Sequence, residues 1–290
     1  MSEDENVIWH YTKMDVLKKI FKDKDIKREK YKKAEKGNIE LRFTHSRFTN
    51  DPSESLILRK FLETNKNTIL GNLDENIRNE VKKCQEINYY EKVFDNDCDN
   101  LGNDCYPFIL STTHSKDSFT FWSKDYAGLD GVAIGINEEI FKQQLKENNK
   151  CHRMLDVIYI DPLSNDMVKS INEKINDIYD YNYVKYKDAY PKFDILYTLL
   201  FYYSSLYKHK SWECEKEVRV ILQKDKIDVK IEFYENKIIP VCYESFNEDV
   251  VNSIMLGPGS NEKAQKAIDM FLKDRGYDNI NVSRSTAFDL

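Results

Sequence analysis

Glycine and proline are scarce in this chain, with nine glycines and six prolines among 290 residues. Both residue types mark tight turns, so their scarcity disfavours an all-β sandwich and favours long helices. The six cysteines are scattered, and no Cys-x-x-Cys pair with the spacing of a zinc site occurs. We therefore expect reduced thiols and no required metal ion.

Long apolar runs are also missing from the sequence. No stretch reaches the roughly 18 apolar residues that are needed to span a bilayer. The first ten residues, MSEDENVIWH, are acidic and lack the basic and apolar regions of a signal peptide. The formal net charge of −6 gives no overall attraction for nucleic acid. We expect a cytoplasmic protein with no membrane partner.

Hydrophobic periodicity divides the chain into strands and amphipathic helices. We expect strands at residues 7–12, 39–44, 108–112, 131–136, 155–160, 217–223, 229–234, 238–241, 254–257 and 279–284. We expect helices at residues 13–24, 55–95, 137–148, 164–182, 192–208 and 261–275. No internal repeat and no linker rich in Pro, Gly or Ser divides the sequence. These patterns predict a single α+β domain over residues 1–290, with helical insertions at 55–95 and 163–208.

Unusual polar residues gather in short motifs, and the first two lie near the N-terminus. Residues 9–12 (WHYT) end the first expected strand, just before a helix. Backbone N–H groups and the helix dipole face such a junction and can bind a ligand there. His10 can hydrogen-bond a ribose hydroxyl or a nicotinamide amide there, or it can be a buried structural histidine. Residues 47–54 (RFTNDPSE) contain a turn and a helix cap, which explain Asn50 and Asp51 without a function.

The third motif joins hydroxyl groups to an aromatic pair. Ser111 and Thr112 lie at the end of a strand, where they can hold a polar ligand. Trp122 and Tyr126 are four residues apart, so on a helical turn they would share a face. Two aromatic rings on one face can stack on a flat ligand ring, and they can equally be core residues.

The fourth motif, residues 210–219 (KSWECEKEVR), leads into a strand. Strand alternation places Glu215, Glu217 and Arg219 on one face, while Val218 faces the core. Two carboxylates and a guanidinium on one face form a charge-coupled set, in which like charge can raise one carboxylate pKa and the arginine counters it. The structural alternative is a solvated face at the edge of a sheet.

Taken in order, these motifs resemble the bacterial "domain of unknown function 2971" family. The resemblance runs from about Val7 to Ser285 through WHYT, FTNDPSE, STT, W-x₃-YAG-x₂-GVAIGI, KSWECEKEVRVI and IMLGPG. The opening HYT-x₄-L-x₂-I is similar, more distantly, to the start of ADP-ribosyltransferase domains. This second resemblance implies a split, strongly bent, mixed or antiparallel β-sheet with flanking helices.

The resemblance to ADP-ribosyltransferase domains also implies an enzyme with NAD as its substrate. His10 would take the first-strand position of the NAD site, Ser111 and Thr112 the middle-strand position, and Glu217 or Glu215 the catalytic late-strand position. The other residues expected to bind NAD are Tyr11, Thr12, Arg47, Asn50, Asp51, Trp122, Tyr126 and Arg219. The implied reaction is ADP-ribosyl transfer or NAD hydrolysis by a toxin or phage-defence effector, with a protein, a nucleic acid or water as acceptor.

Two other functions remain open at this point. Asp51, Glu54, Glu215 and Glu217 could hold Mg²⁺ in a metal-dependent nuclease or hydrolase. Against this function, Lys216 points to the opposite face of the strand from Glu215. The chain could also be a non-catalytic sensor or partner-binding module of a defence system, with the charged helices at 55–95 as its interaction surface.

Overall fold

A computed structural model describes most of the chain, namely residues 6–22, 38–49, 54–79, 105–123, 126–147, 152–161, 165–179, 203–225, 228–234 and 237–287. The strands are β1 Val7–Thr12, β2 Asn38–His45, β3 Cys105–Thr113, β4 Val132–Asn137, β5 His152–Asp156, β6 Ile158–Ile160, β7 Tyr207–His209, β8 Glu217–Asp225, β9 Lys230–Tyr234, β10 Lys237–Asn247, β11 Val251–Leu256 and β12 Asn281–Arg284. The α-helices are α1 Leu17–Ile20, α2 Glu54–Gly71, α5 Glu138–Glu147, α6 Asn165–Ile178 and α9 Glu262–Asp274. The 3₁₀ helices are η1 Met14–Val16, η2 Ser46–Phe48, η4 Phe119–Trp122, η7 Ser204–Leu206, η8 Lys210–Glu215 and η10 Glu248–Val250.

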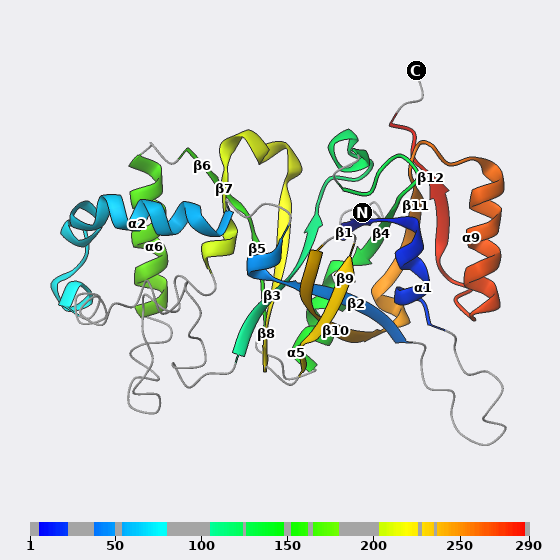
Figure 1. Ribbon diagram of the computed structural model, residues 1–290, viewed down its shortest axis with the longest axis horizontal. Helices are drawn as coiled ribbons and strands as arrows, with labels where there is room; N and C mark the ends of the chain where they lie inside the picture. The colour runs from blue at the N-terminus through cyan, green and yellow to red at the C-terminus, as the bar shows by residue number, and fades with distance from the viewer. Residues whose placement is uncertain are drawn as a thin grey trace.

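One large mixed sheet forms the centre of the molecule, and helices flank it (Figure 1). The strand order is β12-β11-β4-β1-β3-β2-β10-β9, with β8 paired to β3 and β5 paired to β8. The pairing of β11 with β12 is parallel, and the other pairs of this sheet are antiparallel. Strands β6 and β7 form a separate parallel pair. The predicted α+β class is confirmed.

The sheet is split at β3. One edge of β3 pairs with β8 from Cys105 to Thr113. A strand has only two edges, so β1 and β2 share the other edge of β3. Strand β1 pairs with it at Thr113, and β2 pairs with it at Ile109. The two strands therefore diverge along β3, and the carbonyl of Ser111 lies between the two pairing points. The Nδ1 atom of His10 lies 2.9 Å from that carbonyl oxygen.

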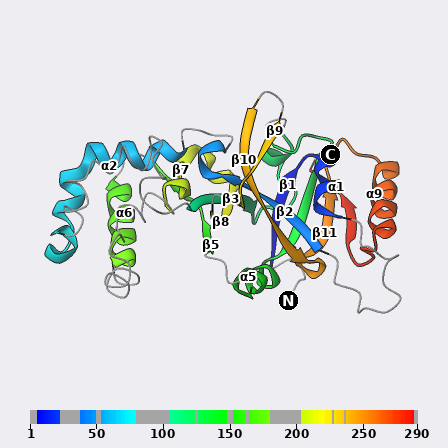
Figure 2. The same cartoon turned by 60° about the horizontal axis from the view of Figure 1, so that its bottom comes forward.

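The core lies on both faces of this sheet. One apolar cluster packs the sheet against α1, α5 and α9 and includes Val220 and Leu222 of β8. A second cluster joins α2, α6 and η7 to the opposite face through Ile109 and Ile221. Figures 1 and 2 show α2 and α6 together at one end of the molecule and α9 at the other. Among the helices described, none combines the length and apolar character needed to cross a membrane.

Side-chain caps explain where two helices begin. The Asn137 side chain accepts a hydrogen bond from the Ile140 N–H at 3.1 Å, and Asn261 accepts one from the Ala264 N–H at 3.0 Å. Helix α9 is followed by Gly276, whose φ of 80° is readily adopted only by glycine. These caps confirm the predicted starts of both helices and the predicted end of α9.

Several predicted elements differ from the structure. The strand expected at 155–160 is two strands, β5 and β6, that belong to different sheets. The helix expected at 13–24 ends at Ile20, because Phe21 forms a β-bridge with Ile39. Of the helix expected at 192–208, the structure describes only residues 203–208, which form η7 and most of β7. Within the insertion expected at 55–95, α2 ends at Gly71, and residues 80–95 lie outside the described part of the chain.

Candidate functional site

The fourth sequence motif forms a buried network of charged groups. We use the name carboxylate network for Glu215, Glu217, Lys208, Arg219 and Tyr126. Each of its four charged residues is 6% exposed or less. The solvated-edge alternative is wrong, because β8 has a partner on each edge, β3 on one and β5 on the other. Two acidic and two basic groups therefore share a site from which water is largely excluded.

Glu217 and Arg219 lie on the same face of β8, as strand alternation predicts. The Arg219 Nε donates to Glu217 Oε1 at 2.7 Å, and its Nη2 donates to Glu217 Oε2 at 2.9 Å. Its Nη1 donates to the carbonyl of Ser205. This two-pronged contact fixes both the position and the rotation of the Glu217 carboxylate.

Glu215 reaches the network by a different route from the one predicted. It ends η8, and Lys216 follows with a left-handed backbone, φ 43° and ψ 48°, before β8 begins at Glu217. A non-glycine residue costs about 1 kcal/mol in this conformation. The Thr113 hydroxyl holds the turn by donating to the Glu215 carbonyl at 2.5 Å. The turn, and not strand alternation, brings the two carboxylates together.

The pair β6–β7 supplies two residues that the sequence interpretation missed. Lys208 and Tyr159 are register partners in this parallel pair, so their side chains leave it on the same face. The Lys208 Nζ donates to Glu215 Oε2 at 2.5 Å and to Glu217 Oε2 at 3.3 Å. The Tyr159 hydroxyl accepts from the Glu217 N–H at 2.8 Å. Lys208 is the only Lys or Arg in residues 193–208, a signal that could have identified it.

One aromatic residue, Tyr126, belongs to the network, and another, Trp212, lies beside it. The Tyr126 hydroxyl donates to Glu215 Oε1. Burial, and then the hydrogen bond and charge of Glu215, raise the pKa of Tyr126, so this residue remains a donor. Trp212 of η8 is partly exposed, and the Lys208 Nζ lies 5.3 Å from its ring centroid. This distance lies within the range of a cation–π contact.

The charges of the network keep Glu217 ionised. Burial alone would raise the pKa of this carboxyl. The charge and hydrogen bonds of Arg219, the charge of Lys208 and a hydrogen bond from the Ser111 side chain outweigh burial and lower its pKa to about 2. Glu217 is therefore a fixed negative charge near neutral pH, suited to stabilising positive charge and unsuited to accepting a proton.

The low pKa of Glu217 predicts a loss of stability in acid. Because the pKa falls from 4.5 to about 2 on folding, the stabilisation is complete above about pH 4.5 and is lost as the pH falls towards 2. The shift corresponds to about 3 kcal/mol. Urea unfolding across this pH range should show a steeper decline for the wild type than for Glu217→Gln. Parallel declines would contradict the assignment.

Ser111 lies beside the network, and His10 is linked to it through the Ser111 carbonyl. Ser111 is exposed and is the register partner of Arg219, so its side chain shares a face of the sheet with Glu217 and Arg219. Burial lowers the pKa of His10, and the charge of Arg42 lowers it further, against a hydrogen bond with the Ser111 carbonyl that raises it. A carbonyl can only accept, so Nδ1 of the neutral ring carries the proton and Nε2 is left as an acceptor.

The structure places four other predicted residues in supporting positions. Trp122 is buried, and its Nε1 donates to Asp117 at 2.8 Å, so it cannot stack on a ligand as predicted. Thr112 is buried and donates to the Val218 carbonyl at 2.9 Å, so its hydroxyl is not available to NAD. The Tyr11 hydroxyl accepts from the Ser118 N–H at 3.1 Å and donates to the Ser115 carbonyl. Thr12 ends β1 as the register partner of Val132.

The second sequence motif lies mostly outside the described residues. This applies to Asn50, Asp51 and the side chains of Arg47 and Glu54. Of the acidic cluster considered for Mg²⁺, only the Glu215 and Glu217 side chains are described, and Lys208 and Arg219 already neutralise them. Within the described ranges, no group of three or more His, Cys, Asp or Glu side chains is arranged to hold a metal ion.

Comparison with known proteins identifies one family. Residues 121–220 match the family described as "Protein of unknown function (DUF2971)", which confirms this resemblance over that part of the chain. The matched segment contains every member of the carboxylate network, whereas His10 and Ser111 lie before it. No curated protein and no solved structure matches the chain. The resemblance to ADP-ribosyltransferase domains therefore stays a prediction.

Proposed function

We propose that this chain is an NAD-consuming enzyme of the ADP-ribosyltransferase type, with Glu217 as its catalytic carboxylate. One observation carries the proposal: Ser111 connects the other two predicted site residues. Its side chain shares a face of the sheet with Glu217, and its carbonyl oxygen lies 2.9 Å from the His10 ring. The three residues come from β8, β3 and β1, whose strands meet where Thr113 pairs with both Trp9 and Glu217.

The charge of Glu217 suits cleavage of the bond between nicotinamide and ribose. When this bond breaks, its electron pair leaves with nicotinamide, and the ribose carbon gains positive charge. A carboxylate that is already ionised and held rigidly stabilises that charge without reorganisation. A ribose hydroxyl is the same kind of donor as the Ser111 hydroxyl, which shares a face of the sheet with Glu217 in the free protein. The lone pair of the acceptor then forms the new bond to the ribose carbon, and the proton that the acceptor loses passes to water.

The neighbouring residues have distinct roles in this proposal. His10 Nε2 accepts a hydrogen bond from a ribose hydroxyl or from the nicotinamide amide. Tyr126 flanks the nicotinamide, and Glu215 orients the acceptor. Arg219 is committed to Glu217 and the Ser205 carbonyl, so we do not expect it to bind the pyrophosphate of NAD. Arg47 is the remaining predicted cation for that role. The acceptor is a protein, a nucleic acid or water, and the setting is a cytoplasmic toxin or defence system.

Binding and cleavage of NAD by the purified protein test this proposal. Near-saturating NAD, at about 100 times its dissociation constant, should stabilise the fold by about 3 kcal/mol, and nicotinamide should appear in solution. Ser111→Ala removes a hydroxyl beside Glu217, so we expect at least about tenfold slower nicotinamide release from a protein that circular dichroism shows to be folded. Chromatography of nicotinamide and a thermal melt measure both effects.

Three outcomes would contradict the proposal. Stabilisation by Mg²⁺, with cleavage of nucleic acid that EDTA abolishes, would establish the nuclease alternative. No response to NAD or Mg²⁺ would favour a non-catalytic binding module. Full nicotinamide release by Ser111→Ala would remove Ser111 from the site.

A further inference from the structure

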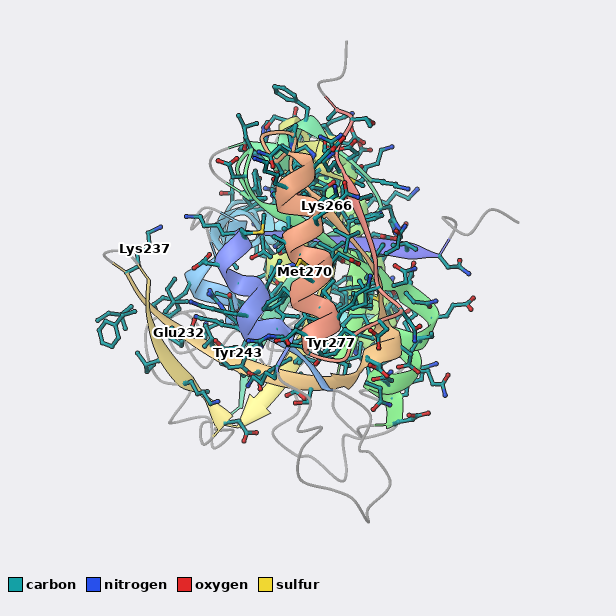
Figure 3. The ribbon with its side chains drawn as sticks, turned by 90° about the vertical axis from the view of Figure 1, so that its right-hand side faces the viewer. Glu232, Lys237, Tyr243, Lys266, Met270 and Tyr277 are labelled. Carbon is teal, nitrogen blue, oxygen red and sulfur yellow. The ribbon has the colours of Figure 1, made fainter. Side chains whose placement is uncertain are left out.

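The hairpin of β9 and β10 exposes apolar side chains on one face. Phe233 is 80% exposed, and Ile231 and Ile238 are also exposed. Phe233 is the register partner of Ile238, and Ile231 is the partner of Pro240, so these four side chains share a face. Figure 3 shows the hairpin standing out from the body, with Lys237 far from Met270 of α9. An apolar surface of this kind marks an interaction site.

Strand β9 is also an edge of the large sheet. In the part of the chain that the structure describes, no strand pairs with its outer edge. Residue pairs along an antiparallel ladder alternate between hydrogen-bonded and non-hydrogen-bonded pairs. Pro240 has no N–H, so we assign its pair with Ile231 to the non-hydrogen-bonded kind. The backbone N–H and C=O of Ile231 therefore point outward, and by the same alternation so do those of Phe233. An exposed edge of this kind is a template for another strand.

The opposite face of β9 carries two charged side chains in defined positions. Glu232 is bound by Lys19 and Arg42, each at 3.3 Å, and by the Tyr243 hydroxyl. The Lys230 Nζ lies 5.0 Å from the ring centroid of Tyr243. Figure 3 shows Glu232 of β9 and Tyr243 of β10 close together. Lys230 and Glu232 thus present alternating charge along the edge strand.

We propose that two copies of this chain associate through β9, antiparallel and in a register centred on Ile231. This register places Ile231 opposite its own copy, so the outward backbone groups of Ile231 can pair with each other across the two-fold axis. It also places Lys230 opposite the partner's Glu232, and the two-fold axis repeats that pair. Cross-strand pairs of opposite charge stabilise such a ladder.

Charge complementarity selects this register and a second copy as the occupant. The two β9 strands can form hydrogen bonds only in registers that place residues with outward-pointing backbone groups opposite one another. Moving the centre to Glu232 would place two carboxylates opposite each other, and moving it to Lys230 would place two ammonium groups opposite each other. Like charges directly opposite are destabilising. The association is independent of the proposed NAD chemistry, so either can fail without the other.

Sedimentation velocity of the full chain over a range of concentrations tests the association. The wild type should shift from monomer to dimer as its concentration rises. Phe233→Asp should weaken the dimer at least about tenfold. Met270→Asp changes a side chain of similar exposure, 70%, on α9 and should leave the dimer unchanged. A wild type that stays monomeric at about 100 µM, well above a micromolar dissociation constant, or equal effects of the two variants, would overturn the proposal.

A charge exchange tests the register itself. Lys230→Glu alone and Glu232→Lys alone each place like charges opposite one another in their own dimers, so each variant should be monomeric. A mixture of the two variants restores opposite charges at both cross-strand pairs of residues 230 and 232. It should form a dimer that contains one copy of each variant. Circular dichroism of each variant verifies its fold. Dimerisation of either folded variant alone, or no association in the mixture, would contradict this register.

Discussion

Replacing Arg219 with methionine should lower the free energy of unfolding by about 3–5 kcal/mol, because it leaves a buried carboxylate without its main partner. Of its two cationic partners, Glu217 would keep only Lys208, at 3.3 Å, and Lys208 also serves Glu215. The Ser205 carbonyl would lose its donor as well. Chemical denaturation measures this loss of unfolding free energy. The comparison requires the slope of free energy against denaturant concentration to be the same for the wild type and the variant.

Arg42→Met is the matched control for this substitution. Arg42 also pairs with a glutamate, Glu232, at 3.3 Å, but both side chains are partly exposed. A pair of this kind contributes less than about 1 kcal/mol. If Arg219→Met is too unstable to study, the double variant Arg219→Met, Glu217→Gln removes both members of the pair and should recover part of the loss. If Arg219→Met and Arg42→Met lowered the free energy of unfolding equally, the buried network would contribute no more than a partly exposed ion pair.

Glu217→Gln should reduce nicotinamide release from NAD by at least about 100-fold, the effect of losing one preorganised electrostatic contact to a transition state. The amide has nearly the same shape as the carboxylate but carries no charge. The effect should appear in the turnover rate more than in NAD affinity, because positive charge develops only as the bond breaks. Steady-state kinetics, together with a thermal melt in the presence of NAD, separates these two quantities.

Glu232→Gln is the control for a general effect of removing a paired carboxylate. Glu232 is held by Lys19, Arg42 and Tyr243 on another part of the sheet, so its loss should leave the turnover rate unchanged. The Glu217→Gln protein must first be shown to be folded by circular dichroism. A folded Glu217→Gln protein with the wild-type turnover rate would remove Glu217 from the catalytic role.

Local patterns in the sequence predicted much of the fold. Alternation over residues 217–223 correctly placed Val218 in the core and Glu217 with Arg219 on the other face. Asparagine caps and a glycine with positive φ correctly marked helix ends, because these signals depend only on nearby backbone groups. Periodicity failed at residues 155–160, where one apolar run serves two sheets.

The candidate site was only partly predictable, because long-range pairing completes it. The parallel pairing of Lys208 with Tyr159 brings a buried ammonium to the carboxylates, and no local pattern contains that information. Glu215 depends on the left-handed conformation of Lys216, which alternation does not anticipate. The spacing of Trp122 and Tyr126 could not show that one ring is buried and the other contacts Glu215.

The most direct test of the central claim is a structure of the folded protein with NAD or a non-cleavable analogue bound. We predict that the ribose next to nicotinamide lies beside Ser111, with a ribose hydroxyl hydrogen-bonded to the Glu217 carboxylate and His10 Nε2 close to the same end of the ligand. A dinucleotide bound elsewhere on the protein, with Glu217 still closed off by Ser111, Arg219 and Lys208, would contradict the claim.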